Sequence, residues 1–245
     1  MVTRPDDPHD PLAEQLRQRG AEVILQPAIC ISPPSDWQPV DAALARLDQF
    51  DWLVFSSANG VRYLLDRLMQ NGDLGQLHDV KLAAIGPGTA DELARYELHT
   101  DLVPDRYRAE ALAEALAHVA PGRRFLLARA SRGREVLAEQ LAAAGATVEQ
   151  IVVYNSTDVE HPDAETAALL RAGRIDWITV TSSAIARSLA RLLGEDLRRA
   201  KLASISPITS GVLRELGYEP AVEAVEYTMP GLVAAIADGY CRSEK

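Results

Sequence analysis

A nine-residue stretch of this chain occurs twice in similar form, and this duplication limits the possible folds more than any other feature. Residues 51–59 read Asp-Trp-Leu-Val-Phe-Ser-Ser-Ala-Asn, and residues 176–184 read Asp-Trp-Ile-Thr-Val-Thr-Ser-Ser-Ala, which places the second copy 125 positions later. The segment 12–16 recurs at 137–141 with the same spacing. A repeat of this length indicates one structural unit used twice.

A second pair of motifs extends the repeat. Residues 81–89 return as residues 201–209 at a spacing of 120, so the second copy has lost five residues. A duplicated α/β unit is expected to give two similar lobes with a cleft between them. The matched motifs then indicate which residues face that cleft.

Composition indicates the class of protein and the cellular compartment that we expect for it. The chain has 245 residues, of which 47% are hydrophobic and 24% charged, as in ordinary globular proteins. No apolar run is long enough to span a membrane, and the N-terminus lacks the layout of a signal peptide. Cys30 and Cys241 form neither a disulfide framework nor a metal-ligand pattern. We therefore expect a cytoplasmic protein without a membrane partner.

The net charge of −10 argues against nucleic acid as a partner, because contacts to phosphates need a basic surface. It leaves room for a small anionic substrate, which backbone N–H groups and a few arginines can hold. The five histidines stand at no repeated motif, so the sequence offers no metal site and no histidine-dependent triad.

Short apolar runs alternate with longer segments of helical period, which predicts doubly wound parallel sheets covered by helices on both faces. The expected strands are 22–26, 52–55, 82–85, 101–103, 124–128, 147–153, 177–180, 202–205 and 220–224. The expected helices are 11–19, 59–70, 89–96, 109–118, 132–144, 164–172, 183–193, 209–216 and 231–238.

The joints between the repeat pieces predict how the pieces are shared between two domains. A tight turn at 120–123 keeps its neighbours in one body, whereas the polar, proline-containing stretches 32–39 and 155–162 suit extended crossings. We expect one discontinuous domain of residues 1–31 and 158–245 and a second of residues 40–153. Residues 32–39 and 154–157 would then form a two-stranded linker. A plain tandem of the two copies remains an alternative.

The first motif pair is a strand, then a run of small and hydroxyl residues, then a helix. The runs are Ser56-Ser57-Ala58 and Thr181-Ser182-Ser183. Ligands of open α/β sheets collect at the carboxyl ends of strands, where helix N-termini present N–H groups. Plain N-capping explains each run taken singly. Their recurrence beside a second motif favours a binding role.

That second motif is again a strand, a turn and a helix start. It reads Gly86-Pro87-Gly88-Thr89 in one copy and Ser206-Pro207-Ile208-Thr209 in the other. The N–H groups there suit a carboxylate or phosphate. The glycine pattern matches neither a P-loop nor a dinucleotide fingerprint, so we expect no nucleotide.

Arginines and tyrosines complete the candidate set. Arg4 and Arg129 occupy repeat-equivalent positions at expected strand ends, where a guanidinium can pair with a carboxylate. Tyr154 ends a strand at the lobe junction and could donate a proton to a leaving hydroxyl, or be a packed hinge residue instead. Tyr107 and Tyr227 precede equivalent helices, where cleft lining and helix-start packing compete.

These features together resemble the uroporphyrinogen-III synthase (HemD-like) family over essentially the whole chain. The similarity lies in the order and spacing of motifs that are individually weak, namely 3–5, 12–20, Pro27, 51–57, Val61, 85–87, Thr89, Tyr107, Tyr154, 181–183, Pro207, Thr209, 227–228 and 231–232. The resemblance implies two α/β domains of similar, flavodoxin-like fold, a two-stranded linker and an active-site cleft between the domains.

The resemblance also implies a reaction. Members of the family close hydroxymethylbilane, which carries eight carboxylates, into uroporphyrinogen III without a cofactor, inverting ring D through a spiro intermediate and losing water. They serve the biosynthesis of haem, sirohaem, cobalamin or chlorophyll. Tyr154 matches the tyrosine proposed to assist the loss of water. The implied partners are the small-molecule substrate and a hydroxymethylbilane synthase that hands it over to a monomeric enzyme.

Motifs and resemblance together give one set of candidate binding residues. The set is Arg4, Ser56, Ser57, Ala58, Gly86, Pro87, Thr89, Arg129, Thr181, Ser182, Ser183, Lys201, Ser206, Pro207, Ile208, Thr209 and Tyr227. Two positions depart from the expected pattern. Ser206 replaces a glycine where a carboxylate would approach, and Glu97 replaces the helix-ending glycine found at its repeat mate Gly217. A non-catalytic tetrapyrrole-binding or sensor protein of the same fold is the alternative reading.

Overall fold

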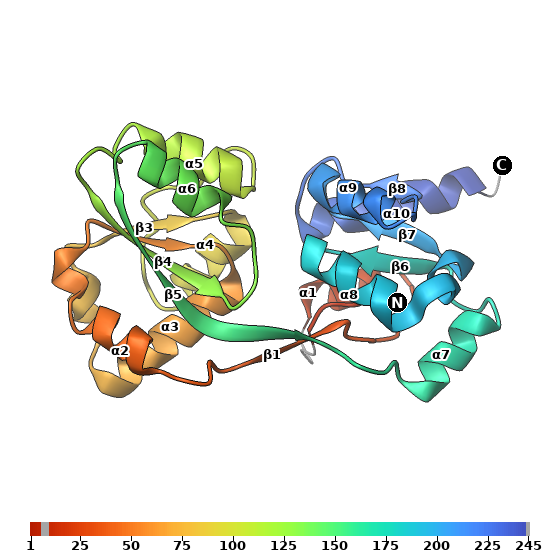
Figure 1. Ribbon diagram of the computed structural model, residues 1–245. Coiled ribbons are helices and arrows are strands. Elements are labelled where there is room, and N and C mark those ends of the chain that lie inside the picture. The colour runs from red at the N-terminus through yellow and green to blue at the C-terminus, as the bar shows by residue number, and fades with distance from the viewer. Residues whose placement is uncertain (6–9, 244–245) are drawn as a thin grey trace. The chain divides into compact units, whose positions relative to one another are not determined.

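The structure is a computed structural model that describes residues 1–5 and 10–243. The chain divides into two compact units (Figure 1). Unit 1 comprises Met1–Ile31 and Thr157–Lys245, and unit 2 comprises Ser32–Ser156. Unit 1 is therefore built from both ends of the chain, and unit 2 from its middle.

Unit 2 contains a five-stranded sheet in the order β1-β5-β4-β2-β3. Its strands are β1 (Ile29–Ser32), β2 (Trp52–Phe55), β3 (Lys81–Ala84), β4 (Arg124–Ala130) and β5 (Thr147–Asp158). The neighbours β5, β4, β2 and β3 all pair in parallel. The first three residues of β1 belong to unit 1, and β5 continues for two residues beyond the boundary.

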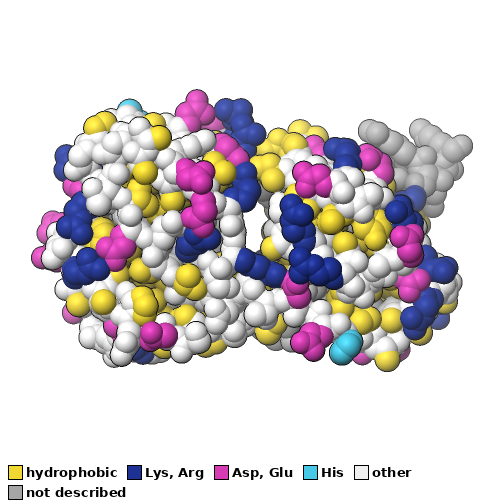
Figure 2. Space-filling model, in the orientation of Figure 1, with side chains coloured by type: hydrophobic (Ala, Val, Ile, Leu, Met, Phe, Trp, Pro, Cys, Tyr) yellow, Lys and Arg dark blue, Asp and Glu magenta, His cyan; other side chains and the backbone are white. Residues whose placement is uncertain are grey.

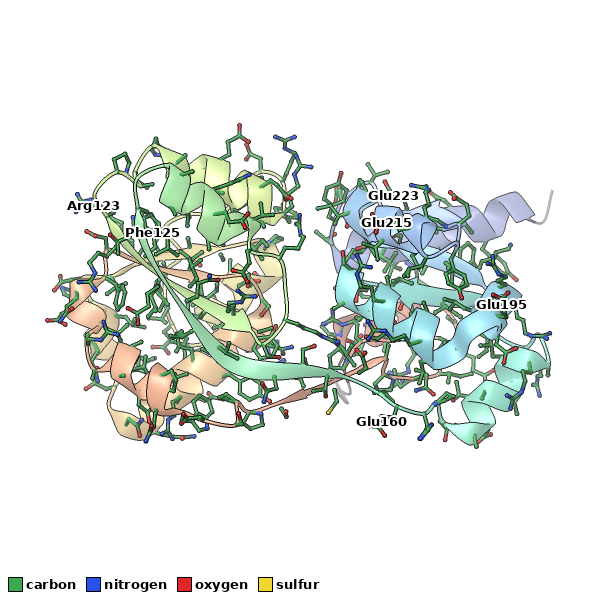
Figure 3. The ribbon with its side chains drawn as sticks, in the orientation of Figure 1. Arg123, Phe125, Glu160, Glu195, Glu215 and Glu223 are labelled. Atoms are coloured by element: carbon green, nitrogen blue, oxygen red, sulfur yellow. The ribbon has the colours of Figure 1, made fainter. Side chains whose placement is uncertain are left out.

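The helices of unit 2 cover the sheet because its strands are apolar on both faces. They are α2 (Gln38–Leu44), α3 (Ala58–Asn71), α4 (Pro87–Ala94), α5 (Ala109–Ala117) and α6 (Val136–Ala143), with 3-10 turns η1 (Leu47–Gln49) and η2 (Leu74–Leu77). All four residues of β2 are buried. Trp52 stacks on Phe125, its register partner on β4, with ring centroids 6.1 Å apart. Leucines of α5 and α6 complete this core, and Figure 3 labels Phe125 within it.

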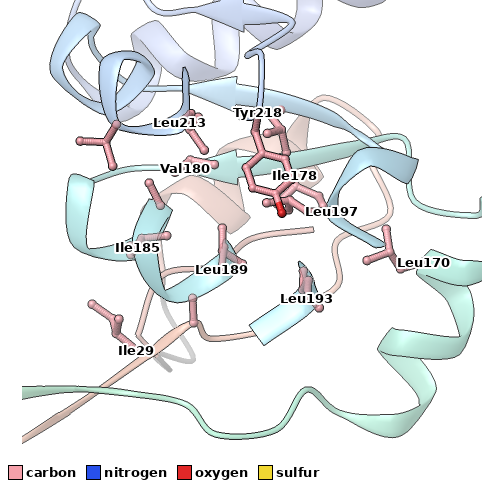
Figure 4. Packing of buried hydrophobic residues seen from close by; sticks show 14 of the residues in the cluster. Ile29, Leu170, Ile178, Val180, Ile185, Leu189, Leu193, Leu197, Leu213 and Tyr218 are labelled. Atoms are coloured by element: carbon pink, nitrogen blue, oxygen red, sulfur yellow. The ribbon is translucent and has the colours of Figure 1, made fainter. Parts of the chain in front are cut away.

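Unit 1 contains the parallel sheet β6-β7-β8, formed by β6 (Trp177–Val180), β7 (Lys201–Ser204) and β8 (Val222–Glu223). Its helices are α1 (Pro11–Gln18), α7 (Ala164–Arg171), α8 (Ser183–Leu193), α9 (Pro207–Glu215) and α10 (Met229–Ser243), with the 3-10 helix η3 (Gly194–Arg199). Figure 4 shows Ile178 and Val180 of β6 packed with Ile185 and Leu189 of α8 in one of its cores.

Two expected strands are much shorter than predicted. Residues 22–26 make only the isolated bridge Val2↔Leu25, and residues 101–103 only Ala83↔Leu102. Residues 22–26 nevertheless extend the sheet of unit 1 through residues 1–3, which lie between them and β6. Val2 bonds to the backbone of residues 24 and 26, and Met1 and Thr3 bond to the backbone of Thr179 on β6. The remaining strands and all nine expected helices are present within a few residues of their predicted bounds. The doubly wound α/β fold is confirmed.

Five helices end in the same backbone motif. In each, the residue after the last turn has positive φ and the next N–H bonds to a carbonyl five residues back. Four of these positions are glycines, namely Gly20, Gly145, Gly173 and Gly217. The fifth is Glu97, whose φ is 60°, and it is the one non-glycine residue with positive φ among those described.

Charged side chains of both signs are interspersed over the visible face of each unit (Figure 2). Many are paired locally, such as Arg123 with Asp51 at 2.6 Å. Within the described residues, no helix is both long and apolar enough to cross a membrane.

Candidate functional site

The strand order of unit 2 creates a place where a ligand can approach. The chain runs from β2 outward to β3 on one side, and from β4 outward to β5 on the other. The connections after β2 and β4 therefore diverge to opposite faces of the sheet, and in open α/β sheets ligands bind at such a divergence, in the crevice at the carboxyl ends of the strands. Ser56 and Ser57 follow β2 at this point, and Ser131 follows β4. In unit 1, Thr181 and Ser182 follow β6 in the equivalent way.

The structure brings two of the predicted residues into direct contact at this crevice. The Ser57 Oγ and the Tyr154 hydroxyl lie 3.0 Å apart, although 97 positions separate them in sequence. Tyr154 is level with the end of β4, because it pairs with Ala130 in the β4–β5 register. Ser57 is also the N-cap of α3, and its Oγ accepts the Gly60 N–H at 3.0 Å. The phenol is thus hydrogen-bonded to the start of a helix.

Tyr154 is nearly buried, with 7% of its surface exposed. Burial raises the pKa of its phenol, because the charged phenolate is poorly solvated there, while the hydrogen bond with Ser57 lowers it. The net direction is upward, so the group holds its proton at neutral pH. A phenol in this state can donate a proton but is not suited to act as a base.

The second motif of unit 2 lies at the start of α4. Gly86 is its N-cap, and a Cβ at this position would lie 3.0 Å from the Cβ of Tyr107. The glycine therefore lets Tyr107 pack against the helix start. Pro87 occupies the first turn, and Thr89 is buried there at 6% exposure.

The equivalent turns of unit 1 are capped by serines. Ser182 accepts the Ile185 N–H at 3.2 Å at the start of α8, with Ser183 as the first helical residue. Ser206 caps α9, and its Oγ lies 3.2 Å from the Thr209 Oγ1. The extra side chain at position 206 is thus turned back onto its own helix. Tyr227 is half-buried, in line with Tyr107 in the other copy.

The predicted arginines lie at the expected ends but already have partners. Arg129 is ion-paired with Glu135 and donates to the Gln150 Oε1 at 2.8 Å. The bonds that Glu135 receives from Arg129 and from Gln150 hold the pKa of its carboxyl below the usual range. Arg4 donates to the buried Asp10 carboxylate at 2.5 Å. An anionic ligand would have to compete with these carboxylates for either guanidinium.

Lys201 does not join the other candidates. It is the first residue of β7 and pairs in register with Trp177, the first residue of β6. Thr181 follows the last residue of β6, so about 13 Å of strand separates the two ends. The Lys201 ammonium lies 5.3 Å from the centre of the Trp177 ring, as Lys81 lies 5.5 Å from Trp52 in the other copy. Lys201 therefore lies away from Thr181, because its repeat motif begins at the amino end of the strand.

Sequence reasoning missed one aromatic residue at the crevice. Tyr63 of α3 stacks on Tyr154 with ring centroids 5.7 Å apart and planes 22° apart. The available signal was its position six residues after Ser57 on the same helix.

Two buried hydroxyls of unit 1, the Thr179 Oγ1 and the Ser210 Oγ, have no hydrogen-bond partner within the described part of the chain.

Comparison with known proteins decides the family. The model of the family "Uroporphyrinogen-III synthase HemD" matches residues 10–234. The chain belongs to the uroporphyrinogen-III synthase family. A curated uroporphyrinogen-III synthase from Synechococcus elongatus is 34% identical, with 96% of this chain and 93% of the relative covered. The Escherichia coli uroporphyrinogen-III synthase is 29% identical over 89% of this chain and 92% of its own length.

Solved structures agree in fold. A mutant uroporphyrinogen III synthase from Thermus thermophilus matches with a TM-score of 0.65 at 19% identity, covering 99% of both chains. The uroporphyrinogen-III synthetase from Helicobacter pylori matches with a TM-score of 0.63 at 20% identity, covering 89% of this chain and 93% of its own. As a uroporphyrinogen-III synthase family member, the chain is an enzyme of tetrapyrrole biosynthesis, a hydro-lyase. Family membership does not favour a non-catalytic binding protein.

Proposed function

We propose that this chain closes hydroxymethylbilane into uroporphyrinogen III with inversion of ring D, and that Tyr154 donates a proton to the departing hydroxyl. The contact between Tyr154 and Ser57 carries this proposal, because it holds a protonated phenol at the crevice of unit 2. The hydroxymethyl group leaves readily, so a weak acid that is held in place is sufficient.

The carboxylates of the substrate need several separate donors. Helix starts offer N–H groups outside the intrahelical ladder, and the capping hydroxyls lie beside them. We therefore assign carboxylate contacts in unit 2 to 56–58, 86–87 and Thr89, and in unit 1 to 181–183, 206–209 and Tyr227. Arg4 and Arg129 would contribute after exchange of their present partners. Lys201 is left out because it lies at the opposite end of the sheet.

Product analysis tests the proposal. Freshly prepared hydroxymethylbilane is incubated with the protein, and the oxidised porphyrin isomers are separated. We expect isomer III, whereas formation of isomer I alone, as in spontaneous closure, would contradict the assigned reaction.

The role of Tyr154 has its own test. Tyr154→Phe removes the phenolic proton and keeps the ring, so kcat should fall about a hundredfold while KM changes little. Tyr218→Phe is the matched control, since Tyr218 is an equally buried tyrosine of unit 1 that donates to the Gly194 carbonyl. Parent turnover in Tyr154→Phe would remove the phenol from the reaction.

We further propose that the enzyme works as a cytoplasmic monomer and receives its substrate from hydroxymethylbilane synthase. The short lifetime expected of a readily leaving hydroxymethyl group supports such a hand-over. Light scattering at assay concentration should give the mass of one chain. In a coupled assay, added synthase should lower the fraction of isomer I more than the same flux of free hydroxymethylbilane does.

A further inference from the structure

The phenol of Tyr154 is held at its oxygen by a group that is itself fixed to the backbone. The Ser57 Oγ accepts the Gly60 N–H at the first turn of α3. A Cβ at position 60 would lie 3.3 Å from the Ser57 Oγ, so the glycine leaves room for this hydroxyl at the start of the helix. The location of the Ser57 hydroxyl is therefore set by its hydrogen bond to the first turn of α3.

The same phenol is held at its ring by a second residue of α3. Tyr63 is half-buried and stacks on Tyr154 at 5.7 Å between ring centroids. Offset stacking of this kind restricts rotation about the terminal side-chain torsion, which is otherwise broad for tyrosine. One helix thus limits both where the phenolic oxygen lies and how the ring is turned.

The second copy of the repeat shows that the aromatic pair is not a general need of the fold. Ser188 of α8 stands 125 positions after Tyr63, at the equivalent helix position. It also contacts β5, through a 2.6 Å hydrogen bond to the Asp158 carboxylate. The repeat equivalent of Tyr154, 125 positions earlier, is Ile29, so unit 1 has a tyrosine at neither position of the pair.

We propose that Ser57 and Tyr63 are positioning residues for Tyr154, with the serine hydroxyl fixing the phenolic oxygen and the tyrosine ring fixing the plane of the phenol. The inference rests on the proposed role of Tyr154 as proton donor. It assigns Ser57 a task besides contact with the substrate, and it gives Tyr63 a part in the reaction.

The two contacts affect the acidity of the phenol in opposite directions. Burial raises the pKa of Tyr154, the Ser57 hydrogen bond lowers it, and the charge interaction with the Tyr63 hydroxyl raises it. Loss of the serine hydroxyl should therefore raise the pKa, and loss of the Tyr63 side chain with its hydroxyl should lower it. A purely structural role would not produce shifts of opposite sign.

The experiment follows the phenol directly and measures turnover in parallel. The full-length protein is labelled with tyrosine carrying ¹³C at the ring Cζ, and the Tyr154 signal is assigned with Tyr154→Phe. The signal is titrated in the parent, Ser57→Ala and Tyr63→Leu. We expect the Tyr154 titration to move up in Ser57→Ala and down in Tyr63→Leu. In both variants kcat should fall at least tenfold, and in Tyr63→Leu, which removes no proposed substrate contact, KM should stay within about threefold of the parent value.

Conservative variants separate positioning from folding. Ser57→Thr keeps a capping hydroxyl and Tyr63→Phe keeps the stacked ring, so each should restore most of the turnover. Ser57→Thr should also keep a near-parent titration, whereas Tyr63→Phe lacks the hydroxyl and should still titrate below the parent. Ser182→Ala removes the equivalent cap of α8 and should leave the Tyr154 titration unchanged. It controls for the loss of a helix cap as such.

The outcomes distinguish this inference from the proposed function. If Tyr154→Phe lowers turnover while Ser57→Ala and Tyr63→Leu leave both the Tyr154 titration and kcat unchanged, the positioning role is wrong and the proton donor stands. Equal loss of kcat in Tyr63→Phe and Tyr63→Leu would also overturn the role given to the ring. If Tyr154→Phe keeps parent turnover, both the donor and its positioning fall together.

Discussion

Replacing Glu97 with glycine should stabilise unit 2, because this position has a backbone conformation that disfavours a side chain. Glu97 has φ of 60° at the end of α4, in the motif that glycine occupies at the ends of α1, α6, α7 and α9. A left-handed conformation costs a non-glycine residue about 1.5 kcal/mol. Glycine adds about 0.7 kcal/mol of conformational freedom to the unfolded chain. The net gain in the free energy of unfolding is about 0.8 kcal/mol.

Urea denaturation followed by tryptophan fluorescence measures this gain. Trp37 and Trp52 report on unit 2 and Trp177 on unit 1, so Trp177→Phe gives a background in which fluorescence follows unit 2 alone. With a urea dependence of about 1.5 kcal/mol/M, the midpoint should rise by about 0.5 M. Glu97→Ala is the matched control, because it removes the carboxylate but keeps the strained backbone. An equal rise in Glu97→Ala, or no rise in Glu97→Gly, would refute the reasoning.

Three further predictions concern single side chains. Asp51 accepts the Arg124 N–H and pairs with the neighbouring Arg123, and both contacts depress the pKa of its carboxyl. The stability that the carboxylate adds should be complete above about pH 4 and should fade as pH falls through the depressed pKa. Asp51→Asn should therefore flatten the acid limb of a curve of unfolding free energy against pH, and an unaltered limb would count against this carboxylate. Ser206→Gly should change the unfolding free energy by only about 0.3 kcal/mol and turnover less than twofold, because the Ser206 hydroxyl caps α9 and does not project outward; a large gain in turnover would show that it obstructs the substrate. Lys201→Met should lower stability by about 0.5 kcal/mol through loss of the contact with Trp177, and a KM raised more than threefold would return Lys201 to the binding set.

Much of the fold could be predicted because the relevant signals are local. The four residues of β2 are apolar on both faces, and Ser57 and Ser182 stand where helix caps are expected. Strand length was less predictable. Residues 101–103 have the composition of a strand, yet they make a single bridge to β3, since pairing depends on how far the partner strand extends.

The site was predictable in its residues but not in its contacts. Helix caps and strand ends locate Ser57 and Tyr154 separately, but their hydrogen bond depends on the register of β5 against β4. The end of the strand at which Lys201 lies was not predictable either. Its repeat equivalence to Lys81 is real, but equivalence between copies does not tell which end of a strand a residue occupies. The partners of Arg4 and Arg129 likewise depend on tertiary placement.

The discontinuity of unit 1 has a consequence for synthesis on the ribosome. Its cores need Val2 and Leu12 from the first residues together with Leu232 and Ile236 from the last helix. The middle of the chain can complete unit 2 while the first thirty-one residues are still waiting for partners not yet translated. The apolar residues before β1 must therefore wait without their core partners for most of translation, so a chaperone that binds nascent chains should act mainly on this segment.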